Sequence, residues 1–245
     1  MKVNKLLQLL KENQSGDAPA IRSEVAADGV HVYIYDVIDS YWGASAASLV
    51  NALADAAGKT IHLHINSPGG DVFEARAMAA AIVGHAGRVV AHIEGVAASA
   101  ATYLALSANE VRMTDGSLFM VHNSWTLAMG DRSELRTTAD LLEKIDGTIA
   151  ADYGRKTGAA ADQIAAWMDA ETWFTAQEAL DAKFIDAIDP TSKASAEARW
   201  NLSAYANAPK LKEKVPSSQE LNEQVTAQLV HNRNRLRLMA QAEPI

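Results

Sequence analysis

The sequence of 245 residues contains no cysteine, and this absence excludes several kinds of site. The chain cannot form disulfides, thiolate zinc sites or iron–sulfur clusters, and it cannot use a cysteine nucleophile. Aromatic residues are also scarce, at 6%, whereas 49% of the residues are hydrophobic and 21% are charged. This balance is typical of a folded globular chain and excludes disordered, fibrous and small disulfide-rich proteins. A chain of this length can bury one substantial core.

Long hydrophobic runs are absent as well. The longest apolar stretches are rich in alanine and are shorter than the roughly 18 residues that a membrane-spanning helix needs. The opening segment, MKVNKLLQLLKENQ, lacks the uninterrupted apolar run and the small-residue cleavage site of a signal peptide. We therefore expect no membrane contact, a cytoplasmic location, and a short amphipathic helix within the N-terminal segment 1–19.

The net charge of −8 is unevenly distributed. Residues 191–245 hold 8 basic and 5 acidic residues, which leaves 14 basic and 25 acidic residues in 1–190. An acidic body disfavours non-specific binding of nucleic acid, so we expect no nucleic-acid partner.

Strand-like and helix-like segments alternate along the first half of the chain. This alternation predicts an α/β fold, in which a parallel sheet is joined by crossover helices. Strands are expected over 30–38, 60–66, 88–95, 110–113 and 117–122, and helices over 44–57, 72–86 and 97–108.

The pattern changes after Gly130. Residues 131–157 predict one long helix that ends at Gly158, and a shorter helix, a strand, a helix and a final strand follow up to residue 189. Beyond Pro190 the sequence is polar, and helical periodicity returns only over 218–240. We therefore expect an N-terminal segment 1–19, a folded domain 20–190, and an extension 191–245 made of a polar linker and a C-terminal helix.

A serine and a pair of glycines lie at the starts of two predicted helices. Ser99 falls in the first turn of an alanine-rich helix, where unpaired N–H groups and the helix dipole surround its hydroxyl. This arrangement is similar to the nucleophile elbow of serine hydrolases, although a serine packed among alanines is the simpler alternative. The segment NSPGGD at 66–71 can present N–H groups to an anion, or it can be only a tight turn.

Histidine supplies the third candidate group. His122 leaves the predicted strand 117–122 and can serve as a base. His62 and His64 share one face of a strand, but no third metal ligand is evident, so we expect packing or surface roles for both. The remaining histidines show no partner pattern; they are His31, His85, His92 and His231.

Four blocks of sequence together resemble the Clp protease proteolytic subunit (ClpP) family of serine peptidases over residues 20–190. They occur in the family's order and at near-family spacing: INSPGGDV at 65–72, EGVAASAAT at 94–102, SLFMVHNSW at 117–125 and ETWFTAQEALDAKFID at 171–186. The resemblance implies the ClpP/crotonase-like fold with a long handle helix, for which residues 131–157 are the candidate. Crotonase-like enzymes share the fold but not the pairing of serine with histidine.

The resemblance also implies a serine endopeptidase that works through a Ser-His-acid triad and an acyl-enzyme. Ser99 matches the nucleophile and His122 the general base, while Gly70 and Ala100 match the backbone donors of the oxyanion hole. The acid position aligns with Glu171, where the family usually has aspartate. Glutamate can orient a histidine too, but its extra methylene needs a shifted backbone, so Asp169 remains a rival. No metal or organic cofactor is implied.

The style of WGASAASLVNAL and ETWFTAQEAL, together with the polar extension, resembles the head maturation proteases of phages and prophages, which process capsid or scaffold proteins. A housekeeping ClpP-type degradative subunit is the alternative. Its ATP-driven unfoldase would be a separate partner, because the chain has no G-x-x-x-x-G-K-[ST] loop. A catalytically inactive scaffold with the same fold is a further alternative.

The family resemblance further implies a homo-oligomer. The expected assembly is a ring of seven subunits, or two such rings stacked through the long helix 131–157. In the phage interpretation the expected location is the host cytoplasm or the assembling capsid.

Overall fold

The computed structural model describes residues 9, 12, 13, 19–54, 56, 58–190 and 200–209. The chain divides into two compact units, Met1–Ala208 and Pro209–Ile245. The folded domain expected from the sequence ends at residue 190, whereas the first unit continues to Ala208, because residues 200–208 pack on the sheet. The linker 191–199, the predicted helix 218–240 and His231 lie outside the described residues.

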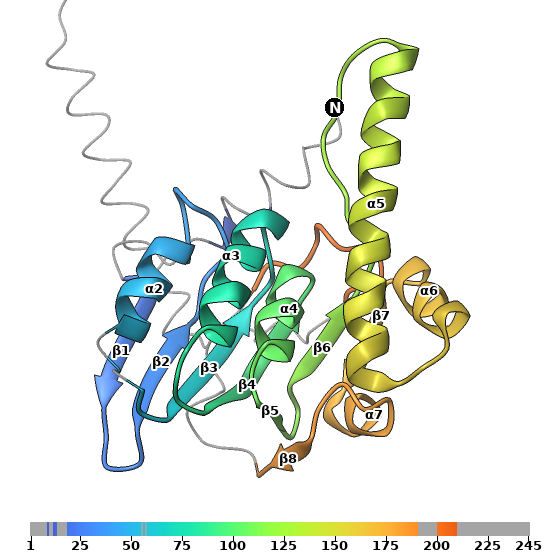
Figure 1. Cartoon of the computed structure of the whole chain (residues 1–245). Helices are drawn as coiled ribbons and strands as arrows, with labels where there is room; N and C mark the ends of the chain where they lie inside the picture. The colour runs from blue at the N-terminus through green and yellow to red at the C-terminus, as the bar shows by residue number, and fades with distance from the viewer. Residues whose placement is uncertain are drawn as a thin grey trace, which may run out of the picture. The chain divides into compact units, whose positions relative to one another are not determined.

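A mixed sheet of eight strands forms the centre of the first unit (Figure 1). The strand order is β1-β2-β3-β4-β5-β8, and β6 pairs with both β4 and β7. Only β1–β2 and β6–β7 are antiparallel among these pairs, so the expected α/β fold with parallel strands is confirmed. The strands are β1 (Ile21–Val25), β2 (Val30–Ile34), β3 (Ile61–Ser67), β4 (Val89–Ala98), β5 (Glu110–Thr114), β6 (Leu118–Val121), β7 (Thr172–Thr175) and β8 (Ala187–Asp189).

Strand β4 pairs with two strands in succession. Its first half, up to Ile93, pairs with β5, and its last residues, Val96–Ala98, pair with β6. The prediction that this strand ends at Gly95 and that a helix starts at residue 97 is therefore wrong, because pairing with β6 extends the strand through Ala98. As a result, Ser99 lies at the junction of a strand and a helix.

Three helices cover one face of the sheet (Figure 1). They are α2 (Ala46–Ala54), α3 (Val72–Val83) and α4 (Ala100–Leu106). Alternate strand residues face them, and burial of each large aliphatic side chain contributes about 1.5–3 kcal/mol to stability. On β2 and β3 these buried residues are Val30, Val32, Ile34, Ile61, Leu63 and Ile65.

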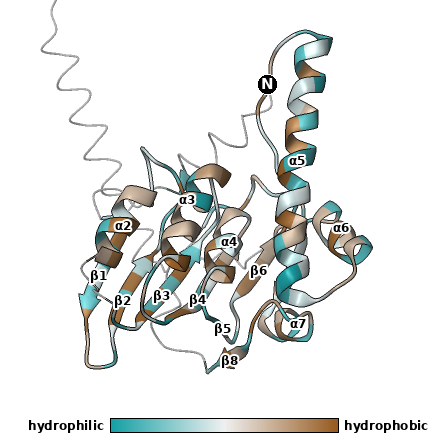
Figure 2. Cartoon of the chain, viewed as in Figure 1, coloured by the Kyte–Doolittle hydropathy of each residue, from teal (hydrophilic) through white to brown (hydrophobic). Residues whose placement is uncertain are grey.

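Helix α5 (Arg132–Thr157) begins and ends where the sequence predicts. Asp131 and Glu134 form a capping box at its start, and Gly158 adopts a left-handed conformation at its end, with φ of 71°. The buried residues of α5 are Ile149, Tyr153 and Thr157, all in the last turns. The preceding turns project away from the sheet and mix hydrophobic with hydrophilic residues (Figures 1 and 2). Two shorter helices follow, α6 (Ala161–Asp169) and α7 (Ala176–Asp181).

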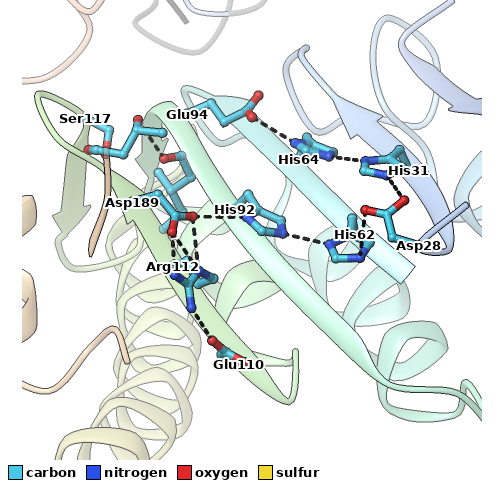
Figure 3. Close-up of polar contacts among 12 residues, drawn as sticks. Asp28, His31, His62, His64, His92, Glu94, Glu110, Arg112, Ser117 and Asp189 are labelled. Carbon is cyan, nitrogen blue, oxygen red and sulfur yellow. Dashed lines mark hydrogen bonds and ion pairs between the residues drawn. The ribbon is translucent and has the colours of Figure 1, made fainter. Parts of the chain in front are cut away.

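The opposite face of β2, β3 and β4 carries a histidine ladder, formed by His31, His62, His64 and His92 (Figure 3). His31 Nδ1 lies 2.8 Å from His64 Nε2, and His62 Nδ1 lies 3.0 Å from His92 Nε2. The rings stack with centroids 4.8–5.3 Å apart. Carboxylates flank the ladder, namely Asp28, Glu94 and Asp189. The roles of His31 and His92 were not predicted from the sequence, because cross-strand pairing brings them to His62 and His64.

The same face becomes apolar toward the carboxyl end of β4. Side chains of β4, β6 and β7 form a second buried cluster there with residues 200–208 and with Leu9. We call this region the covered face. It contains Val96, Ala98, Leu118, Met120 and Trp173 from the sheet, covered by Leu9, Trp200, Leu202, Ala204, Tyr205 and Ala208.

Neither a membrane span nor a metal centre is found in the part of the chain that the structure describes. Across those ranges, no helix has the length and hydropathy that a bilayer crossing requires. The same ranges hold no group of three or more histidine, aspartate or glutamate side chains arranged to bind a metal ion.

Candidate active site

Ser99 and His122 come together at the carboxyl end of the sheet. Ser99 follows β4 and His122 follows β6, and these two strands are parallel neighbours. Since parallel strands end at the same edge of a sheet, both side chains emerge side by side. Ser99 Oγ and His122 Nε2 are 2.8 Å apart, which is a hydrogen-bond distance. A serine in this contact can transfer its proton to the imidazole as it attacks a carbonyl carbon.

The backbone of Ser99 is strained at the junction of β4 and α4. Its φ of 54° lies in the left-handed region, which residues with a side chain rarely adopt. Ser99 is the N-cap residue of α4, yet its hydroxyl makes no capping hydrogen bond. The side-chain oxygen of an N-cap serine normally accepts a hydrogen bond from a backbone N–H group in the first turn of the helix. Here the turn directs the oxygen toward His122 instead.

The turn after β3 lies directly against Ser99. A side chain at Gly69, whose φ is 92°, would come within 2.6 Å of the Ala98 carbonyl oxygen and 2.9 Å of Ser99 Cβ. At Gly70, a Cβ atom would lie 2.1 Å from the Ile38 carbonyl oxygen. The glycine pair therefore permits two close backbone approaches, which explains why this turn needs glycine.

Hydrogen bonds fix this turn to the segment after β2. Ile38 donates to the Gly69 carbonyl at 2.9 Å, and Asp71 donates to the Ile38 carbonyl at 2.8 Å. The N–H group of Gly70 takes no part in this bridge. The turn therefore holds Gly70 beside the serine while its N–H group stays outside the bonds that fix the backbone.

Glu171 lies next to His122 in the register of the sheet. Val121 pairs with Thr172 in the antiparallel β6–β7 ladder, so the following residue of β6 and the preceding residue of β7 are adjacent. The Glu171 carboxylate accepts hydrogen bonds from the backbone N–H groups of Ala206 at 2.9 Å and Asn207 at 2.6 Å. Its backbone is also left-handed, with φ of 47°.

The rival acid, Asp169, lies at the end of α6 and is exposed. Its carboxylate accepts a hydrogen bond at 2.7 Å from the side chain of Asn123, the residue after His122. Asp169, Glu171 and His122 line a common cavity of about 310 Å³, together with Tyr205. Both candidate acids therefore line the same cavity as His122.

A second, smaller cavity of about 20 Å³ lies on the helix side of Ser99 and His122. Its lining is mainly apolar and comes from α3, α4 and α5, with Val72, Ala75, Ile149 and Tyr153 among its residues.

One residue at the site lies outside every block that the sequence analysis singled out. Tyr205 comes from the polar extension, and its ring meets the His122 ring edge to face, with centroids 5.4 Å apart. The available signal was the spacing of Trp200, Leu202 and Tyr205, which are large apolar residues in an otherwise polar stretch.

Comparison with known proteins agrees with this geometry. The model of the Clp protease family matches residues 20–191. The chain is 29% identical over 175 residues to the ATP-dependent Clp protease proteolytic subunit 1 of Leifsonia xyli subsp. xyli, covering 71% of this chain and 89% of that protein. It is 30% identical over 169 residues to the subunit 1 of Protochlamydia amoebophila, covering 66% and 81%.

A third relative is matched over a shorter range. This is the ATP-dependent Clp protease proteolytic subunit of Bacteroides fragilis, to which the chain is 31% identical over 136 residues, covering 54% of this chain and 64% of that protein. The family match covers the strands and helices that bring Ser99 and His122 together. The chain therefore belongs to the Clp protease family of serine-type endopeptidases.

Proposed function

We propose that this peptidase cleaves peptide bonds with Ser99 as the nucleophile and His122 as the general base. The observation that carries the proposal is the distance of 2.8 Å between Ser99 Oγ and His122 Nε2, at a turn that leaves the serine hydroxyl uncapped. His122 takes the proton as Ser99 attacks the scissile carbonyl. The imidazolium then protonates the leaving amine, and water activated by His122 hydrolyses the acyl-enzyme. This chemistry needs no metal and no organic cofactor.

The backbone N–H groups of Gly70 and Ala100 are the proposed oxyanion donors. Gly70 lies in the turn against Ser99, and Ala100 is the first residue of α4. Both N–H groups therefore flank the serine, where the carbonyl oxygen becomes negatively charged. Donors fixed in advance at such a position typically lower the barrier by about 3–4 kcal/mol each.

Glu171 is the proposed acid, with Asp169 as the alternative. The support for Glu171 is its position beside His122 in the β6–β7 register. The support for Asp169 is its hydrogen bond to Asn123, which follows His122 in the chain. The acid would hold the imidazole in the tautomer that accepts the serine proton and would stabilise the imidazolium.

Replacement of the serine tests this proposal. Ser99→Ala should lower turnover of a fluorogenic peptide by at least about 1,000-fold, since the nucleophile is removed. The wild-type chain should react with a fluorophosphonate probe at Ser99, and the variant should not. Ser48→Ala, which changes an exposed serine of α2, is the matched control and should behave as wild type. Wild-type turnover by Ser99→Ala would refute the assignment, and an unlabelled wild type would favour the inactive scaffold.

For the biological role, we propose a phage or prophage head maturation protease that processes capsid or scaffold proteins. The support is the similarity of the segments at 42–53 and 171–180 to such proteases, together with the extension beyond the family-matched residues. Incubation with a capsid or scaffold protein should give defined fragments by mass spectrometry without ATP.

A housekeeping degradative subunit is the second candidate, and the names of the relatives favour it, since those proteins are called ATP-dependent. Cleavage of folded proteins only in the presence of ATP and a co-purifying unfoldase would select this role over head maturation.

We further propose that the chain works in the cytoplasm or an assembling capsid as a homo-oligomer, a seven-membered ring or two rings stacked through α5. The support is the apolar surface on the projecting turns of α5, where Leu135 and Leu141 are exposed. Mass measurement by light scattering tests the assembly.

A further inference from the structure

Residues 200–208 are part of the first compact unit although they follow the family-matched region, which ends at residue 191. Trp200 anchors the segment through a hydrogen bond of 2.7 Å from its Nε1 to Asn66 Oδ1. Asn66 also accepts a bond from the backbone N–H of Val96, so this anchor reaches β4. At the same end, the Asn201 N–H donates to the Asn13 side chain at 2.6 Å.

Within this segment, Tyr205 is the residue that contacts the proposed catalytic pair. Its side chain is only 5% exposed, and its hydroxyl donates a hydrogen bond to the carbonyl oxygen of Pro68. Burial raises the pKa of Tyr205, so its hydroxyl stays protonated and remains a donor at neutral pH.

The ring of Tyr205 is held between two aromatic neighbours. It meets His122 at an interplanar angle of 90° and Trp173 at 75°, with centroids 5.4 Å and 5.8 Å apart. Both contacts have the edge-to-face geometry that aromatic rings prefer. The imidazole of His122 therefore has a fixed ring on one side, which restricts its tilt.

Glu171 fixes the backbone immediately after Tyr205. Its two carboxylate oxygens accept the N–H groups of Ala206 and Asn207, and the Asn207 side chain donates to the Ala170 carbonyl at 2.8 Å. Hydrogen bonds to a carboxylate are stronger than those between neutral groups. The segment is therefore held directly next to the tyrosine rather than only at its distant end.

We propose that Tyr205 is a positioning residue of the peptidase reaction, which holds the Pro68–Gly70 turn and the His122 ring in one fixed arrangement beside Ser99. The inference rests on the proposed roles of Ser99 and His122. The hydroxyl of Tyr205 bonds to the turn that carries the proposed oxyanion donor Gly70, and its ring limits the movement of the proposed base His122. Errors of about 1 Å in such an arrangement cost up to about 100-fold in rate, so a single positioning contact has a measurable effect.

The placement of the segment distinguishes positioning from obstruction. The cavity on the helix side of Ser99 is lined by residues of α3, α4, α5 and the strand ends, and its lining includes no residue of 200–208. Tyr205 instead approaches from the covered face of the sheet, among Val96, Ala98 and Met120. Tyr205 therefore does not occupy the helix side of the serine.

The test uses the full chain with Tyr205→Phe, which keeps the ring and removes only the hydroxyl. Turnover of a fluorogenic peptide is expressed per serine titrated by the fluorophosphonate probe, so unfolded protein is not counted. We expect kcat to fall about tenfold while KM stays within about twofold, and the rate of probe labelling to fall in parallel. Tyr41→Phe is the matched control, because Tyr41 is 87% exposed, and it should behave as wild type.

A second variant acts on the same arrangement without changing the tyrosine. Asn207→Ala removes the bond to Ala170 and should lower kcat about threefold, again with little change in KM. It decides the question if Tyr205→Phe does not fold. Unchanged or faster labelling and turnover in the folded variants would overturn the inference while leaving the Ser99 assignment intact. Failure of the wild type itself to label at Ser99 would instead overturn the proposed function.

Discussion

Two halves of one sheet face have opposite chemistry. Across β2, β3 and the first half of β4, the face away from the helices carries the histidine ladder, whose polar groups bond to one another. Across the end of β4, β6 and β7, the same face is apolar and is covered by residues 200–208. Only the covered half adjoins Ser99 and His122.

This difference shows two ways to complete a sheet face. Buried or half-buried polar groups are stable when each finds a partner, and the ladder supplies partners across neighbouring strands. An apolar face needs a further layer, and the chain supplies one from a segment remote in sequence. The first solution should affect stability and its dependence on pH, and the second should affect activity.

Removal of the cover should have the largest effect. A chain that ends at residue 199 should lose at least about 100-fold of its peptidase activity and melt at a lower temperature, because Val96, Met120 and Trp173 become exposed. A chain that ends at residue 208 should keep both properties. Circular dichroism measures the melting temperature of the two truncated chains, and peptide cleavage measures their activity. If the folded domain ended at residue 190, the two truncated chains would behave alike. Equal activity of the chains ending at 199 and 208 would therefore support a boundary at residue 190.

Replacement of the proposed acid should have the next largest effect. Glu171→Gln should lower kcat about 100-fold, because glutamine supplies no charge to stabilise the His122 imidazolium. Asp169→Asn should stay within about threefold of wild type, since its carboxylate bonds to Asn123 at the exposed end of α6. Steady-state kinetics give kcat for the two variants, and their melting temperatures should match that of the wild type. The reverse ranking of kcat would transfer the role of the acid to Asp169.

At the far end of the ladder, loss of an ion pair should weaken folding but not catalysis. Arg112 of β5 donates from Nε to Asp189 of β8 at 2.9 Å and from Nη1 to Glu110 at 2.6 Å. Arg112→Ala should lower the free energy of unfolding by about 1 kcal/mol in urea titrations, with peptidase activity unchanged. Arg155→Ala is the control, because the Arg155 side chain is 74% exposed, and it should change the free energy of unfolding by less. A tenfold loss of activity in Arg112→Ala would contradict the separation of the two halves.

The smallest effect should come from titration of the ladder. Burial, followed by the charge of a neighbouring histidine, lowers the pKa values of His62 and His92 below their ordinary value of 6.5. Below pH 6.5 the unfolded chain therefore binds more protons than the folded chain, so stability decreases as pH falls toward the lowered values. The contribution is fully present above pH 6.5.

Urea unfolding at pH 7.5 and pH 5.5 measures this dependence. We expect the wild type to lose more stability between the two pH values than His92→Gln does, by up to about 1 kcal/mol. His85→Gln, outside the ladder, is the control and should keep the wild-type difference. An equal loss of stability in His92→Gln and in wild type would show that titration of His92 does not contribute to the pH dependence of folding.

Local patterns predicted most of the elements, but not the contacts between distant ones. The helix over 131–157 was predictable because its capping residues and its terminal glycine are adjacent in sequence. Strand β4 was predicted too short, since Gly95 reads as a strand end unless the pairing of Val96–Ala98 with β6 is known. The antiparallel edge strand β1 was missed for a related reason, as its exposed residues follow no apolar pattern.

The site shows the same limit. Ser99 and His122 were predictable because each ends a strand in a specific block of sequence, and the structure places them 2.8 Å apart. Tyr205 was not, because the spacing of Trp200, Leu202 and Tyr205 indicates burial but not what each side chain contacts. The cross-strand bonds of His31 and His92 depend on register, which periodicity alone does not give.

Helix α5 has an uneven distribution of local stability, and amide hydrogen exchange can measure it. Its 26 residues extend about 39 Å, yet its buried side chains all lie from Ile149 onward. A helical half held mainly by its capping box and its own hydrogen bonds opens at low free energy, so amides over 132–145 should exchange quickly in the isolated chain. Slow exchange there in the native protein would mean that another surface packs on this half of the helix, and the degree of protection would give the strength of that contact.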